Sequence, residues 1–199
     1  RNDSVSSPES NPRITARMHV SLLDPENGYG YKGTYMGEKK VLTFGAAYQT
    51  EAAVAYAGTE EVDYSAYTVD MFAEYPVDGI GTFTLSGAYV DVDLDEGYKN
   101  GAPDADVTGL TGEKNGGYVK AGYMLPGMPL QFFGRAEGWT FAKLDDVYDQ
   151  DVDVMGLGFN YYLRGQNLKL TMEYTMVDYD QDDTVEDTDT FAAQLQVIF

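Results

Sequence analysis

Hydrophobic and polar residues alternate with a period of two along most of the chain. The clearest stretch is residues 12–23, where every second side chain is apolar. Its apolar positions are Ile14, Ala16, Met18, Val20 and Leu22. Because successive side chains of a β-strand point to opposite faces, this pattern predicts a strand with one apolar face and one hydrated face.

The same alternation recurs in about nine segments, each close to ten residues long. The segments are residues 12–23, 40–49, 64–77, 82–89, 117–125, 130–141, 152–163, 168–179 and 190–199. A tilted strand needs about 9–11 residues to cross the apolar layer of a bilayer. We therefore predict an all-β fold, an antiparallel transmembrane β-barrel with about nine strands in this chain.

The connections between these segments alternate in length. Residues 78–81, 126–129 and 164–167 are tight turns, whereas residues 50–63, 91–116, 143–151 and 180–189 are longer, acidic loops. Outer-membrane barrels have short periplasmic turns and longer outer loops, and a soluble sandwich with Greek-key crossings has no reason to keep this alternation. Residues 24–40 depart from it, being long and rich in tyrosine where a turn is expected. A short extra wall segment and a turn packed at the lower rim both fit this segment.

Composition narrows the function. The formal net charge of -20 argues against nucleic acid as a partner, and 17 Tyr with 9 Phe are too many for a disordered acidic tail. The chain has no cysteine and a single histidine, His19, which excludes disulfides, thiolate sites and multi-histidine metal cages. No apolar run approaches the roughly 18–20 residues of a transmembrane helix.

The apolar stripes have two interpretations, a surface in contact with lipid and the core of a soluble sandwich. Tyrosines lie near the ends of several stripes, as the aromatic girdles of membrane barrels require. They are Tyr48, Tyr67, Tyr75, Tyr89 and Tyr123. The opposite faces carry charged and amide side chains that suit a water-filled lumen, so lipid is the preferred interpretation.

Strand direction follows from the last segment. If Phe199 ends at the periplasm, counting back nine strands puts Arg1 outside the cell, whereas complete bacterial barrels have an even strand number. We expect residues 1–11 to be an outer loop segment and residues 12–199 the C-terminal part of a larger barrel. The remaining strands would lie on a second chain, whether the chain is cut within a loop or encoded as a split subunit. The structure should then show an open sheet edge.

Ten charged or protonatable side chains face the predicted lumen, where they would set ion preference. The pore-lining candidates are Arg13, Arg17, His19, Asp70, Glu74, Lys120, Arg135, Glu137, Lys169 and Glu173. Arg13, Arg17 and His19 form a basic stripe down one strand. The alternative is that Arg135 with Glu137, and Lys169 with Glu173, pair and merely hydrate the wall.

Other chemistry has less support. Asp91, Asp93 and Asp95 alternate as weak calcium ligands, but the loop lacks EF-hand spacing, and a hydrated acidic loop is the preferred interpretation. Divalent ions could also bridge such loops to lipopolysaccharide. The sequence has no nucleophile elbow, no phosphate-binding glycine loop and no second histidine for a triad, so we predict neither catalysis nor a cofactor.

Four strings resemble the phosphate-selective porin O/P family of bacterial outer-membrane porins. They are GTYMGEKKVLTFG at 33–45, LQFFGRAE at 130–137, GFNYYLRGQNLKL at 158–170 and AQLQVIF at 193–199. The resemblance runs from about residue 12 to 199 and corresponds to the C-terminal half of such porins. It implies a 16-stranded barrel, commonly trimeric, that passes small anions, and it implies that Phe199 is the signal read by the barrel-assembly machinery. The mixture of acids and bases on the lumen face departs from a dense basic ladder, which favours a general pore over a phosphate-selective one.

Three functions follow from these patterns. The leading one is an outer-membrane porin, a water-filled channel for small solutes or ions. A second is a structural barrel that sheathes a partner such as a cytochrome, whose haem would come from that partner because the sequence has no Cys-x-x-Cys-His. The third is a soluble ligand-binding barrel, which would fold without detergent. Single-channel conductance separates the first two.

Overall fold

The computed structural model describes residues 11–26, 32–57, 60–94, 113–143, 150–180 and 186–198. Within these ranges the chain forms nine β-strands in one sheet. The strands are β1 (Ile14–Ser21), β2 (Val41–Ala57), β3 (Glu60–Val77), β4 (Gly81–Asp93), β5 (Glu113–Met124), β6 (Leu130–Lys143), β7 (Gln150–Gln166), β8 (Leu168–Tyr179) and β9 (Thr188–Val197). In the part of the chain that is described, no helix is long and apolar enough to cross a membrane.

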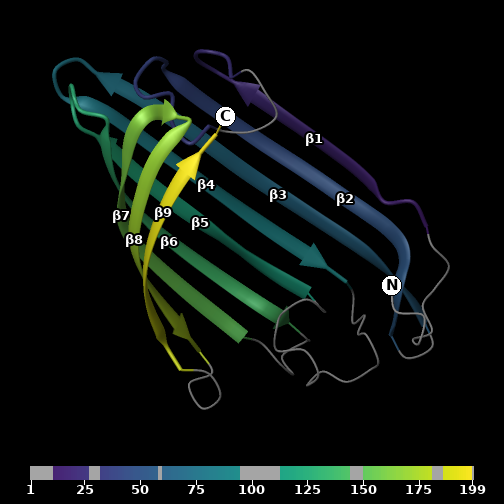
Figure 1. The fold of residues 1–199 in the computed structure, drawn as a ribbon. Helices are drawn as coiled ribbons and strands as arrows, with labels where there is room; N and C mark the ends of the chain where they lie inside the picture. The colour runs from purple at the N-terminus through teal and green to yellow at the C-terminus, as the bar shows by residue number, and fades with distance from the viewer. Residues whose placement is uncertain are drawn as a thin grey trace.

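The sheet is an up-and-down meander. Its strand order is β1 to β9 without a crossover, and every neighbouring pair is antiparallel. Figure 1 shows that the sheet is strongly curved, so that β7, β8 and β9 turn back toward the side on which β1 lies. This is the wall of a barrel, and it confirms the predicted antiparallel β-fold and its strand number.

The pairing register keeps the apolar stripes together on one face. Phe44 of β2 is paired with Met71 of β3, and Leu157 of β7 is paired with Tyr174 of β8. Phe44, Leu157 and Tyr174 are exposed, and Leu157 keeps 66% of its surface accessible. Exposing apolar surface to water costs about 25 cal/mol per Å². A continuous apolar outer face is therefore suited to lipid, as the alternation predicted.

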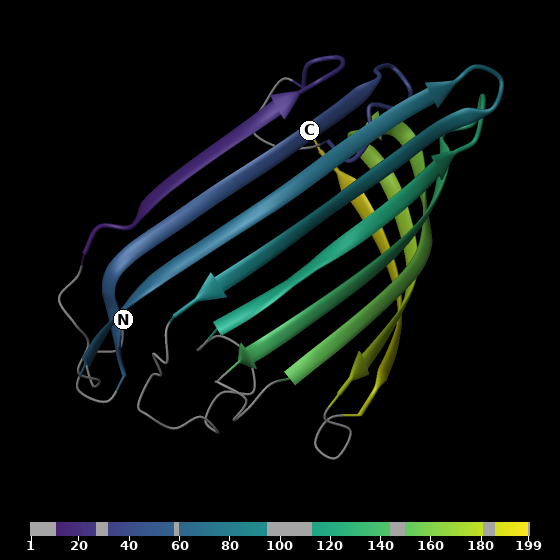
Figure 2. The same cartoon turned by 180° about the vertical axis from the view of Figure 1, so that it is seen from behind.

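The two rims of the sheet differ. The turn rim holds the short connections 78–80, 125–129 and 167 together with residues 22–26 and 32–40. At the opposite end, which we call the loop rim, lie the strand ends Ala57, Asp93, Lys143 and Tyr179 (Figure 2). The predicted tight turns therefore share one rim.

The sheet is open within the described residues, because β1 pairs only with β2 and β9 pairs only with β8. Side chains on both faces of β9 are consequently exposed. The predicted open sheet edge is therefore present in this part of the chain. Arg1 and the rest of residues 1–10, for which an outer position was predicted, lie outside the described residues.

The predicted loop at residues 50–63 is wrong, because β2 continues to Ala57 and β3 begins at Glu60. The register shifts between Glu51 and Ala55, and Ala53 adopts a φ of 51°. A bulge of this kind inserts extra residues into one strand and breaks the period of two without ending the strand. The prediction from alternation alone therefore ended β2 too early and began β3 too late.

Candidate pore lining

The ten predicted pore-lining side chains lie on one face of the sheet, opposite the apolar face. The register connects them in rows: His19 is paired with Gly45 and Gly45 with Asp70, while Lys120 is paired with Arg135. The face is concave, because residue 34 contacts both β3 and the end of β7, which a convex face would separate. The concave face of a barrel wall is the face that lines the lumen.

Arg17 on β1 forms a two-pronged ion pair with Asp70 on β3. Its two terminal nitrogens donate to the two carboxylate oxygens of Asp70 at 2.7 and 3.0 Å. The pair passes over the intervening strand at Gly45, where a Cβ would lie 2.7 Å from the guanidinium. Glycine at this position thus allows a contact between strands that are not neighbours.

Arg13 also has a carboxylate partner. Its Nε donates to Oε2 of Glu51 at 2.9 Å, and its guanidinium lies 4.3 Å from the centre of the Tyr64 ring. The predicted basic stripe of Arg13, Arg17 and His19 exists as a row of side chains, but both of its arginines are compensated. Sequence reasoning missed Glu51 because it assigned that residue to a loop.

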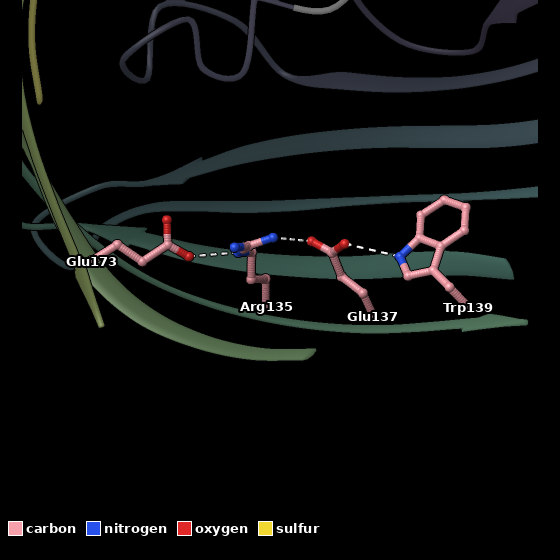
Figure 3. A network of polar contacts seen from close by, with 4 residues as sticks. All are labelled: Arg135, Glu137, Trp139 and Glu173. Atoms are coloured by element: carbon pink, nitrogen blue, oxygen red, sulfur yellow. Dashed lines mark hydrogen bonds and ion pairs between the residues drawn. The ribbon is translucent and has the colours of Figure 1, made fainter. Parts of the chain in front are cut away.

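A second polar network centres on Arg135 of β6. Arg135 Nε donates to Oε1 of Glu173 on β8 at 2.5 Å, Nη1 donates to Glu137, and Trp139 Nε1 donates to Oε2 of Glu137 at 3.1 Å (Figure 3). Gly156 of β7 lies beneath the first contact, and a Cβ there would be 2.9 Å from Arg135 Nε. The predicted pairing of Arg135 with Glu137 is present, and Glu173 is bound by Arg135.

Two lysines on this face lie against aromatic rings. The ammonium of Lys120 is 3.9 Å from the centre of the Phe133 ring, and that of Lys169 is 6.0 Å from the centre of the Tyr162 ring. An aromatic face attracts a cation by its quadrupole without cancelling the charge. These lysines therefore keep a positive field at the inner face.

Glu74 points to the inside, as predicted, but residues 32–37 cover it completely. Its side chain is 0% exposed and accepts hydrogen bonds from Thr34 Oγ1, Tyr35 N and Gly37 N at 2.6, 2.8 and 2.9 Å. This also answers the question that residues 24–40 posed, since the described part of that segment packs against the inside of the wall.

Sequence reasoning missed a belt of neutral polar side chains near the turn rim. Gln131 donates to Thr84 and accepts from Asn160 and Tyr162, while Thr171 donates to Asn160 at 2.7 Å. Buried polar groups need such partners. The available signal was the run of amide, hydroxyl and phenol groups at inner positions, which is less conspicuous than charge.

The structure adds no support for a calcium site at Asp91, Asp93 and Asp95. Among the described residues, no cluster of three or more His, Cys, Asp or Glu side chains has the geometry to hold a metal. Asp91 accepts a hydrogen bond from Tyr89 at 3.4 Å. Asp95, the third predicted ligand, lies outside the described residues.

A curved antiparallel sheet with an apolar outer face and an ion-paired polar inner face defines the wall of a transmembrane β-barrel. The chain belongs to the phosphate-selective porin O and P family, whose family model matches residues 24–199. It is therefore a porin of the bacterial outer membrane, a channel protein rather than an enzyme by family. No curated protein and no solved structure matches the chain.

Proposed function

We propose that this chain supplies part of the wall of a barrel of about 16 strands, through which small hydrophilic solutes and ions diffuse. The observation that supports it is the concave polar face. Ion pairs such as Arg17–Asp70 and Arg135–Glu173 order charged groups that stay partly exposed on that face. A dry core would instead penalise such groups heavily.

The channel has a weak preference for small anions. Most of the acidic side chains on the described inner face are engaged by arginines or, for Glu74, by backbone and hydroxyl donors. Lys120 and Lys169 lie against aromatic rings, which do not cancel a positive charge as a carboxylate does. The preference stays weak because no continuous ladder of bases follows the described wall, so phosphate selectivity is not part of the proposal.

The turn rim faces the periplasm, and residues 1–11 belong to an outer loop. The open edges of β1 and β9 pair with the remaining strands of the barrel. The outer face contacts lipid and lipopolysaccharide, the complete barrels assemble as trimers, and Phe199 serves as the signal for barrel assembly. Phe199 itself lies outside the described residues.

The test is single-channel recording of the assembled porin in planar bilayers. The proposal expects ohmic conductance that scales with KCl concentration, and a small reversal potential of anionic sign in a KCl gradient. The matched variant Lys120→Gln should move that potential toward cations, whereas Lys40→Gln, at a lysine beside Tyr75 on the outer face, should not. A lumen that never conducts and that copurifies with a partner protein would instead support the sheath.

A further inference from the structure

Residues 32–37 at the turn rim fold against the inner wall instead of forming a plain turn. One carboxylate, that of Glu74 on β3, receives three donors from this segment: Thr34 Oγ1, Tyr35 N and Gly37 N. Thr34 also accepts a hydrogen bond from Met36 N at 2.9 Å. Hydrogen bonds to a charged acceptor are roughly twice as strong as neutral ones, so Glu74 fixes the backbone of the segment.

The segment has a second attachment on the far side of the curve. Gln166, at the end of β7, donates from Nε2 to the carbonyl oxygens of Lys32 and Thr34, both at 3.2 Å. Along the sheet, β3 and β7 are four strand spacings apart, or about 19 Å. Residue 34 bridges them because it lies across the concave side of the sheet.

Packing makes the bridge rigid. Tyr35 is buried with Phe72 and Val41 in the one cluster of buried apolar residues found in the described part of the chain, with ring centres of Tyr35 and Phe72 6.4 Å apart. Its hydroxyl donates to Glu26 at 2.9 Å. Burial, followed by this hydrogen bond and the charges of Glu26 and Glu74, raises the pKa of Tyr35 to about 12.

The backbone of the segment is shaped for this position. Met36 and Gly37 both adopt left-handed conformations, with φ of 59° and 83°. A Cβ on Gly37 would lie 2.6 Å from Thr82 Oγ1 on β4, so the segment approaches the wall closely at this point. Left-handed geometry at a residue other than glycine costs energy and persists only where the surroundings hold it.

We propose that residues 32–37 form a constriction of the channel at the turn rim, held in place by Glu74 and Gln166. The proposal rests on the proposed channel function and deepens it by naming the element that limits the size of the solutes. The segment narrows the lumen because it runs across the concave face from β3 to the end of β7. A tight turn between β1 and β2 would stay at the rim and leave the lumen open. Lys32, whose carbonyl oxygen accepts from Gln166, keeps its side chain exposed, and its ammonium is 5.6 Å from the centre of the Tyr35 ring.

The first experiment removes each attachment and records the single-channel conductance of the assembled porin. E74A and Q166A should each raise conductance, by about 1.5-fold or more for E74A, because the narrowest section of a pore limits its current. The matched controls are D78A and N167A, which change neighbouring exposed residues of the same rim that do not hold the segment. Heat-modifiable mobility on gels checks that each barrel has folded.

The second experiment leaves both attachments intact. Because the chain has no cysteine, a single cysteine can be placed at Lys32 (K32C) or, as the control, at Asp78 (D78C). Neutral methanethiosulfonate reagents of increasing size should lower the conductance of K32C progressively and leave D78C unchanged.

The outcomes separate the two proposals. If the unmodified porin conducts but E74A, Q166A and modified K32C all match their controls, the constriction is refuted and the channel stands. If neither the unmodified porin nor any variant conducts, the channel is refuted and the constriction with it. A silent porin that E74A opens would show that the segment closes the pore fully.

Discussion

The substitution Gly156→Ala tests whether small residues of the inner face exist to let ion pairs cross a strand. Arg135 on β6 reaches Glu173 on β8 over Gly156 of β7. An alanine Cβ at this position would be 2.9 Å from Arg135 Nε and would also collide with the Glu173 carboxylate. The contact between Arg135 and Glu173 must therefore break, while the contact between Arg135 and Glu137 can persist.

The expected cost in unfolding free energy can be estimated. A hydrogen bond to a charged group contributes about 1.5–3 kcal/mol. The side chains of Arg135 and Glu173 are 26% and 20% exposed, so water replaces part of that loss and about 1–2 kcal/mol remains. The reduced backbone freedom of alanine in the unfolded chain returns about 0.5 kcal/mol. We expect a net loss of about 1 kcal/mol.

The chain's single tryptophan provides the assay, because Trp139 donates to Glu137 within the same network. Urea unfolding of the refolded porin in lipid vesicles, followed by Trp139 fluorescence, gives the free energy for each variant. Gly134→Ala is the control, since its Cβ would point to the outer face, 3.2 Å from the flexible end of Leu157. Gly134→Ala should leave the free energy of unfolding almost unchanged.

A double-mutant cycle supplies the decisive comparison. In a Glu173→Ala background the carboxylate is gone, so adding Gly156→Ala should cost almost nothing. A coupling of about 1–2 kcal/mol between the two changes is expected. If Gly156→Ala costs the same in both backgrounds, it acts through backbone strain, and the account of the crossing ion pair is incorrect.

Three further predictions follow from the described contacts. The charge reversal Arg13→Glu with Arg17→Glu should shift the reversal potential in a KCl gradient toward cations; an unchanged potential would make the basic stripe purely structural. Leu157→Arg on the outer face should destabilise the barrel in vesicles by about 2–4 kcal/mol, whereas Thr175→Arg on the inner face should not, and equal costs would contradict the lipid-facing assignment. The raised pKa of Tyr35 favours the protonated phenol in the folded state, so the stability it contributes is complete below about pH 10 and is lost as pH rises toward 12. Conductance should accordingly rise over that window in the native porin and not in Tyr35→Phe.

Much of this fold can be predicted from short stretches of the sequence. Alternation at Phe44, Leu157 and their neighbours predicted strands, their faces and the apolar outer surface, because side-chain direction in a strand depends only on sequence parity. The short turns at 78–80 and 125–129 were equally readable, since the chain reverses there between two alternating stretches. The register then follows, because a slip by one residue would turn an apolar face toward the lumen.

Partners on the inner face were not readable in this way. Arg17 pairs with Asp70 and Arg135 with Glu173, each across an intervening strand, and these choices depend on a glycine beneath the contact and on the curvature of the sheet. The bulge after Glu51 was not predicted from the sequence, because it interrupts the period of two although the strand continues.

The sequence by itself determined the β-fold of this protein, the number of its strands and which residues share the polar face of the sheet, since each depends on the order of apolar and polar residues along the chain. Tertiary structure decided how the charges on that face are paired. Glu74 shows the difference most clearly. Parity placed it on the inner face, but only the curved sheet brought residues 32–37 back over it, so that a predicted pore charge became the buried anchor of that segment.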